Sequence, residues 1–324
     1  MAAPSLQTLQ RLGTDTGYQP GTLEKVLRLI DLLEEIAGDA FLRDRLALKG
    51  GTALNVFHLG LDRLSVDIDL NYIGSLDREM MLAERPQIEA ALQRILAAQG
   101  YRVRRLPEEH AGGKWIASYT SALGGPATLE VDLNYVMRQP LFGTARMNSV
   151  QLGTARAKDV LVIDLHEIVA GKIVALLDRR AARDLFDARR IFDIPDIDWR
   201  QVKAAMLAIG AAGRNDWRKA SIDNIGADPK ELRQKLLICL PRTAFAEQGS
   251  VGAWIAETTA LCRARVGPLL TLSVGEQAFL DGVIEQGVID ASGLDAEADL
   301  RSRIAAMPML QWKTSHVRKQ KGGA

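Results

Sequence analysis

The sequence predicts an α/β amino-terminal lobe at residues 1–158, a mixed sheet with helices, followed by a mainly helical lobe at residues 159–324. Short runs in which apolar and polar residues alternate, the pattern of half-buried strands, recur in the first part of the chain. From about Asp159 the apolar residues recur at helical spacing instead. A chain of 324 residues also exceeds one ordinary hydrophobic core, so two lobes are expected.

The individual elements follow from the same patterns. Helices are predicted at residues 21–37 and 76–100, and Pro86 is expected to start or kink the second part of the latter. Strands separated by Gly-rich turns are predicted at residues 46–48, 66–73, 101–106, 114–122 and 128–136, with the turns at 112–113 and 124–125. In the second lobe, a break between helices is expected at residues 193–199.

A glycine-rich turn lies between the first predicted strand and an amphipathic helix, in the run KGGTALNVFHLG. Gly50 and Gly51 permit positive φ there and let another group approach the backbone closely. The N–H groups at the start of the helix favour an anion, and the Thr52 hydroxyl is suited to cap the helix or to donate to a phosphate. This turn is therefore a candidate phosphate site.

Two aspartates follow on the predicted strand VDIDLNYI. Because side chains alternate along a strand, Asp67, Asp69 and Asn71 share one face and apolar residues occupy the other. Hard carboxylate oxygens on a rigid strand suit Mg²⁺ or Mn²⁺, with phosphate completing the shell. A D-x-D pair alone is common on solvated strands, so the prediction depends on its combination with the glycine turn.

This combination resembles the signature of the DNA polymerase β nucleotidyltransferase superfamily. The fuller strings, L-K-G-G-T-A-L and then R-x-S-x-D-I-D-L, are similar to the AbiEii/AbiGii branch, whose members include the MenT toxins. The resemblance implies a polymerase β-type nucleotidyltransferase lobe and an enzyme that uses NTP and Mg²⁺ or Mn²⁺. It also implies a toxin of a type IV toxin–antitoxin or phage-defence system, with a third carboxylate on a later strand and a lysine and an aspartate on a helix.

The third carboxylate is sought on the strand TLEVDLNYV, where Glu130, Asp132 and Asn134 share one face. By its match to the family's pattern Asp132 is the preferred ligand, and Glu130 remains the alternative. Two-metal sites of this kind stabilise both the entering and the leaving oxygen. The competing interpretation of Asp132 is a solvated acid at a strand edge.

The helical run DLHEIVAGKIVALLDRRAARDLFDARRIFD resembles the family's E-x-x-x-x-K … R-D-x-x-D pattern in Glu167, Lys172, Arg183, Asp184 and Asp187. In the family the lysine is tied to the nucleotide and the aspartate of the R-D pair to activity or support of the site. Lys172 and Asp184 are therefore expected to contribute to a cleft between the lobes. The alternative is a solvated, ion-paired helix face.

Other polar residues fit the pattern less specifically. Arg63 and Ser65 stand in the R-x-S-x-D run, where Ser65 is suited to bond a phosphate oxygen and Arg63 to clamp it or to pair with an acid. For Arg179, Arg180, Arg189 and Arg190 a structural role is preferred over RNA contact. The five tryptophans are scattered, and core packing is expected for them rather than base stacking.

Composition sets limits without naming a function. With a net charge of +1, the chain has no overall positive potential that would attract nucleic acid, so any RNA-binding surface would have to be local. Two cysteines predict no disulfide framework, which fits a reducing cytoplasm. No apolar run long enough to span a membrane and no signal peptide are expected. The basic end, residues 316–324, is predicted to be disordered.

The predicted function is transfer of an NMP from an NTP to an acceptor hydroxyl. By analogy with the family the acceptor is an RNA such as the tRNA 3′ end, and a cognate antitoxin is encoded nearby. Two alternatives remain open: a nucleotidyltransferase that modifies a protein or small molecule, and a non-enzymatic nucleotide-binding partner protein.

Overall fold

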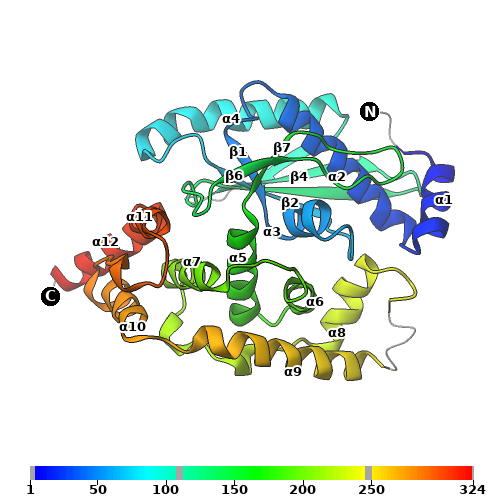
Figure 1. Cartoon of the computed structure of the whole chain (residues 1–324). Helices are drawn as coiled ribbons and strands as arrows, with labels where there is room; N and C mark the ends of the chain where they lie inside the picture. The colour runs from blue at the N-terminus through cyan, green and yellow to red at the C-terminus, as the bar shows by residue number, and fades with distance from the viewer. Residues whose placement is uncertain (1–3, 107–111, 245–249, 323–324) are drawn as a thin grey trace. The chain divides into compact units, whose positions relative to one another are not determined.

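The computed structural model describes residues 4–106, 112–244 and 250–322, and the chain forms two compact units (Figure 1). The first, here called the sheet unit, consists of Met1–Arg138, Thr144–Ile163 and Leu237–Glu247. The second, the helical unit, consists of Gln139–Gly143, Asp164–Leu236 and Gln248–Ala324. The chain therefore passes between the units more than once, whereas the sequence suggested a single boundary at residue 158.

The sheet unit is built on a mixed sheet of seven strands, in the order β3-β4-β5-β2-β1-β7-β6. The strands are β1 (Leu46–Lys49), β2 (Asp67–Tyr72), β3 (Arg102–Leu106), β4 (Gly112–Thr120), β5 (Pro126–Asn134), β6 (Thr144–Met147) and β7 (Val160–Ile163). Strand β2 pairs in parallel with β5 and antiparallel with β1, and β1 pairs in parallel with β7. Segments distant in sequence thus meet at the centre of the sheet.

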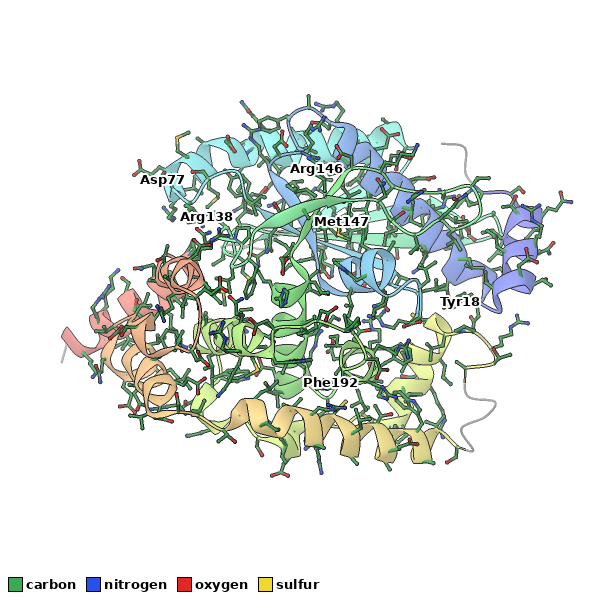
Figure 2. The ribbon with its side chains drawn as sticks, viewed as in Figure 1. Tyr18, Asp77, Arg138, Arg146, Met147 and Phe192 are labelled. Carbon is green, nitrogen blue, oxygen red and sulfur yellow. The ribbon has the colours of Figure 1, made fainter. Side chains whose placement is uncertain are left out.

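Helices cover this sheet because their apolar sides face its buried residues. They are α1 (Leu6–Thr16), α2 (Pro20–Gly38), α3 (Gly50–Thr52), the π-helical turn η1 (Ala53–His58) and α4 (Arg78–Ala98). Helix α2 contacts β5, β7 and α4, and α4 also contacts β3. The hydroxyl of Tyr18, just before α2, donates to the carbonyl of Leu61 (Figure 2). Pro86 lies inside α4, which continues past it.

The helical unit packs its longer helices against one another. These are α5 (Leu165–Asp178), α6 (Ala182–Ile191), α7 (Trp199–Ala212), α9 (Val251–Leu270), α10 (Val274–Asp281), α11 (Ala298–Ala305) and α12 (Pro308–Gly322), with a short α8 (Pro229–Glu231). Helix α5 contacts α6 and α7, and α6 contacts α9. The ring of Phe192 stacks on Trp199 at 5.3 Å between centroids, across the break expected between α6 and α7 (Figure 2).

Several predictions from the sequence are refined. The predicted strands are present, but β6 and β7 were not expected, and residues 112–113 lie inside β4 rather than in a turn. Helix α12 continues to Gly322, where disorder was predicted from residue 316, because its inner side contacts other helices of the unit. Within the residues that the structure describes, no helix is long and apolar enough to cross a membrane.

Candidate active site

Four carboxylates lie on one face of the sheet, on the neighbouring strands β2 and β5. The register sets Asp67 opposite Glu130 and Asp69 opposite Asp132. Side chains of directly paired residues point to the same face, so all four point the same way, while the apolar residues between them face the core. We call this group the acidic face; it contains the D-x-D pair and both candidates for the third carboxylate. Because Asp132 is the register partner of Asp69, these two carboxylates lie next to each other on adjacent strands.

The glycine turn approaches the acidic face closely. Gly50 has φ +71, and a Cβ atom added to it would lie 2.5 Å from Oδ2 of Asp69. Only glycine accommodates both the backbone conformation and this approach. Lys49, the residue before the turn, is the register partner of Asp69. The predicted turn and the predicted carboxylate pair therefore form one local structure in the sheet unit.

Thr52 and Ser65 connect the turn to strand β2. Thr52 is fully buried, and its hydroxyl donates to the Ser65 hydroxyl at 2.9 Å and to the carbonyl of Asp67. No side-chain cap bond is made by Thr52 to the helix that follows. Arg63 is 2% exposed and donates to the carbonyl of Leu64 at 3.0 Å. In this structure the three side chains support the backbone that carries the aspartates.

A lysine accompanies two of the four carboxylates. Nζ of Lys114, on β4, lies 2.6 Å from Glu130 and 3.4 Å from Asp132. The hydrogen bond to Glu130, assisted by the charge of Asp132, raises the pKa of the Lys114 ammonium above its usual value. Lys114 is the register partner of Asp132, so the pairing strand places it there. The sequence analysis missed this residue, because it becomes recognisable only when the β4–β5 register is known.

Hard oxygen donors make up the acidic face, which is the ligand chemistry that Mg²⁺ and Mn²⁺ prefer. Within residues 4–106, 112–244 and 250–322, no three side chains of His, Cys, Asp or Glu are arranged as a preformed metal site. Lys114 supplies the positive charge next to Glu130 and Asp132 in this arrangement.

A second polar cluster lies in the helical unit, where α5 meets α6. Nζ of Lys172 lies 2.6 Å from Asp187 and 3.5 Å from Asp184, and Nε of Arg179 lies 2.6 Å from Asp184. Lys172, Asp184 and Asp187 are all buried, so this is not the solvated face considered as the alternative. Each carboxylate is paired, as buried charges require.

Two further residues of the same run now have visible contacts. Asp187 makes the shorter contact to Lys172. Helical spacing placed Asp187 on one face with Lys172, Arg179 and Arg183, but Asp187 was not predicted to be a site residue. Buried Glu167 accepts from the backbone N–H of Leu141 at 2.6 Å. The contact ties the segment that leads into β6 to the first turn of α5.

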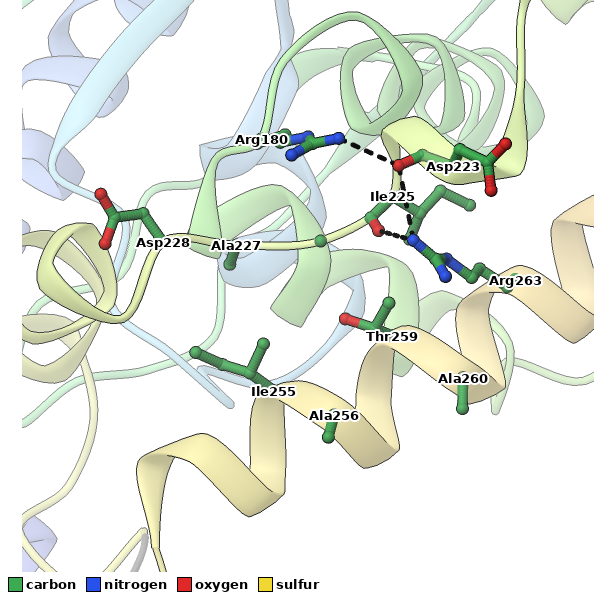
Figure 3. A pocket seen from close by; sticks show the side chains of 11 residues that line it. Arg180, Asp223, Ile225, Ala227, Asp228, Ile255, Ala256, Thr259, Ala260 and Arg263 are labelled. Atoms are coloured by element: carbon green, nitrogen blue, oxygen red, sulfur yellow. Dashed lines mark hydrogen bonds between the residues drawn. The ribbon is translucent and has the colours of Figure 1, made fainter.

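Several arginines outside this cluster pair with an acid or donate to backbone carbonyls of the helical unit. Arg189 and Arg190 pair with Asp193 near the end of α6. Arg180 donates to the carbonyl of Asp223 and lines a cavity of about 740 Å³ between residues 223–228 and α9 (Figure 3). Arg263, from α9, donates to the same carbonyl and to that of Ile225. This cavity contains none of the predicted site residues.

A mixed sheet that presents carboxylates on adjacent central strands, with a helical part after it, agrees with the arrangement that the resemblance to polymerase β-type nucleotidyltransferases implied. Residues 31–249 match the sequence profile of AbiEii, described as the nucleotidyl transferase toxin of a type IV toxin–antitoxin system. The match covers more than half of the chain, so the chain belongs to this family and is a nucleotidyltransferase.

A solved structure similar to this chain is MenT4, a nucleotidyltransferase toxin from Mycobacterium tuberculosis H37Rv. The TM-score is 0.55 at 18% sequence identity, and the similarity covers 94% of this chain and 98% of the MenT4 chain. At this identity the similarity establishes the fold, including both units. A search of curated proteins found no match.

Proposed function

We propose that this enzyme transfers an NMP from an NTP to an acceptor hydroxyl of RNA, such as the 3′ end of tRNA, with release of pyrophosphate, and so acts as a toxin. The observation that supports it most is the register of β2 and β5, which sets Asp69 opposite Asp132. Like charges opposed in this way destabilise a sheet, so a functional reason for keeping them is expected.

Asp67, Asp69 and Asp132 are the residues that would hold divalent metal, with Glu130 as the alternative to Asp132. Metal bound there supplies charge stabilisation for the entering and leaving oxygens of an in-line displacement. Asp132 is further proposed to accept the proton of the attacking hydroxyl. Lys114 balances the charge of Glu130 and Asp132 until metal and nucleotide bind.

The triphosphate is proposed to bind at the turn made by Gly50 and Gly51. Gly50 has no side chain, so the Asp69 carboxylate lies directly against the turn, and phosphate bound at the backbone N–H groups of the turn would lie close to that carboxylate. Thr52, Ser65 and Arg63 keep this backbone in place through their buried contacts, and Ser65 and Arg63 are also proposed to contact phosphate.

Lys172 is proposed to contact the nucleotide phosphates as a point charge. Asp184 would then act as a positioning residue, because it holds both Lys172 and Arg179. A reducing cytoplasm is proposed as the location, since neither Cys239 nor Cys262, both buried, forms a disulfide in the part of the chain that the structure describes. As a member of a toxin family, the chain is expected to have a cognate antitoxin encoded by a neighbouring gene.

The test is a labelling reaction with total cellular RNA, each of the four NTPs labelled at the α-phosphate, and Mg²⁺. Labelled RNA is expected with at least one NTP, and EDTA should abolish the label. Asp69→Asn should lower the rate by several orders of magnitude while the protein stays folded. Asp15→Asn, at an exposed position of α1, is the matched control and should keep the wild-type rate.

The competing functions give different outcomes. Label on protein or on a small molecule with RNA untouched would replace the RNA acceptor by that substrate. Absence of any label with all four NTPs, combined with unchanged toxicity of Asp69→Asn, would favour a non-enzymatic binding protein. A wild-type rate in Asp69→Asn would contradict the metal assignment.

A further inference from the structure

Helix α12 exposes an aromatic pair on its outer side. The Trp312 side chain is 65% exposed, and its ring stacks on His316 with 5.7 Å between centroids and 10° between planes. Trp115, Trp217 and Trp254 are buried in the cores of the two units, as the sequence suggested for all tryptophans. Trp312 differs, and a ligand that covers its exposed ring would gain binding free energy from the burial of that ring.

The charged residues of the same helix are basic. Residues 308–322 contain four Lys and Arg side chains and no acid, in a chain whose net charge is only +1. Lys313 and Arg318 donate to the carbonyls of Gly213 and Gly287. Lys319 and Lys321 are exposed to solvent. The helix therefore carries a local basic surface, although the chain as a whole is almost neutral.

The aromatic pair and one of the lysines share a helix face. Trp312, His316 and Lys319 are spaced four and then three residues apart, so they lie one above another. Leu310 and Thr314 are buried on the opposite, inner side. The exposed residues of α12 around the indole are polar or basic. The surface is therefore a single aromatic ring with polar and basic neighbours, and not a broad apolar patch.

We propose that this face of α12, consisting of Trp312, His316 and Lys319, binds a single-stranded segment of RNA. An unpaired base stacks on the exposed indole, and Lys319 contacts a neighbouring phosphate; aromatic stacking combined with cationic contact to phosphate is how single strands are bound without sequence reading. A membrane or an apolar protein partner would require more apolar area than one ring offers. The proposal rests on the proposed RNA acceptor and names the surface that holds it.

Binding is measured without metal and without NTP, so the result does not depend on catalysis. The probe is a fluorescently labelled single-stranded oligo(A) RNA, titrated with the full-length protein at several salt concentrations. Trp312→Ala is expected to weaken binding roughly 5- to 150-fold, the range found for the loss of one base–aromatic stack. Trp312→Phe retains a ring and should retain most of the affinity.

Lys319 reports on phosphate contact. Lys319→Gln should lower the slope of log affinity against log salt by about 0.7, the value for one phosphate contact on a single strand. Val274→Ala, at an exposed apolar position elsewhere in the helical unit, and Lys230→Gln, at an exposed lysine, are matched controls and should leave binding unchanged.

A purely structural role for the aromatic pair predicts a different pattern. In that case Trp312→Ala would lower the melting temperature and leave RNA affinity at the wild-type value, which would overturn the proposal. Duplex RNA bound as tightly as oligo(A) would also overturn it, because paired bases are not available to stack. If RNA binds through α12 but the labelling reaction modifies only protein, the surface is confirmed and the proposed acceptor is wrong.

Discussion

Replacing Gly50 by alanine tests whether the glycine turn and the acidic face act as one site. The added Cβ atom would lie 2.5 Å from Oδ2 of Asp69, whereas real contacts of this kind stay above 3.0 Å, so the carboxylate must move by about 0.5 Å or more. Gly60 has nearly the same backbone conformation, φ +69 against φ +71, but nothing lies within 4 Å of its added Cβ.

The matched pair separates strain from displacement. Both alanines occupy left-handed backbone, which costs about 1–2 kcal/mol for a residue with a side chain. Gly50→Ala alone displaces Asp69, and overpacking of this sort adds about 1–3 kcal/mol. Because a misplacement on the order of 1 Å can reduce a rate about 100-fold, Gly50→Ala should lose about that factor in activity, and Gly60→Ala should lose little.

Three measurements decide the result: the initial rate of NTP labelling, the melting temperature, and Mn²⁺ binding followed by electron paramagnetic resonance. Weaker Mn²⁺ binding is expected for Gly50→Ala only. Equal rates and equal Mn²⁺ affinities in the two variants, with both proteins folded, would refute the link between the turn and Asp69.

Three other predictions concern charge. Lys172→Met should destabilise the protein by about 3–5 kcal/mol, because it leaves buried Asp187 without its 2.6 Å partner, and combining it with Asp187→Leu should restore part of the loss in thermal melts; a single variant that melts like wild type would contradict this. Lys114→Met should tighten Mn²⁺ binding by up to about fivefold, since a partly exposed ion pair contributes about 1 kcal/mol at most; weaker binding would argue that Lys114 assists the metal. Burial raises the pKa of Tyr18 and of the Cys262 thiol to about 12, above the ordinary values of 10.0 and 9.0, so the unfolded chain loses protons that the folded chain keeps. Stability should therefore fall as the pH rises above about 9, and a melting temperature that stays constant from about pH 8 to pH 11 would contradict the shifts.

The sequence predicted those parts of the site that are contiguous in the chain. Period-two alternation identified β2 and β5, and the paired glycines identified the turn that α3 forms. The pairing of β2 with β5 was not predictable from local pattern, because a parallel register joins segments about sixty residues apart through packing of the whole sheet. For the same reason Lys114 was not recognised: nothing in the residues around it distinguishes it from a solvated strand lysine.

Helical spacing gave a partial answer for the second cluster. It placed Lys172 and Asp187 on one side, but it could not tell a solvated ion-paired face from a buried one, since both use the same residue types at the same spacing. Burial is decided by the helices packed around α5 and α6. For Trp312 the prediction of core packing was wrong. Tryptophan is usually buried, but α12 places this ring on its exposed side.

The carboxylates of the acidic face repel one another, and this repulsion leads to a prediction about the stability of the fold. Asp69 and Asp132 are directly opposed on adjacent strands, and such like-charge pairs are unfavourable by about 0.2–1 kcal/mol. Asp69→Asn should therefore melt about 0.3–1.5 °C higher than the wild type in EDTA while losing activity, since the unfolding entropy of a chain of 324 residues is about 0.7 kcal/mol/K. Adding Mn²⁺ should raise the melting temperature of the wild type much more than that of the variant, since ligand binding stabilises only the form that binds. If Asp69→Asn is less stable than the wild type in EDTA, the carboxylate contributes to the fold itself, and no metal would be needed to explain its presence.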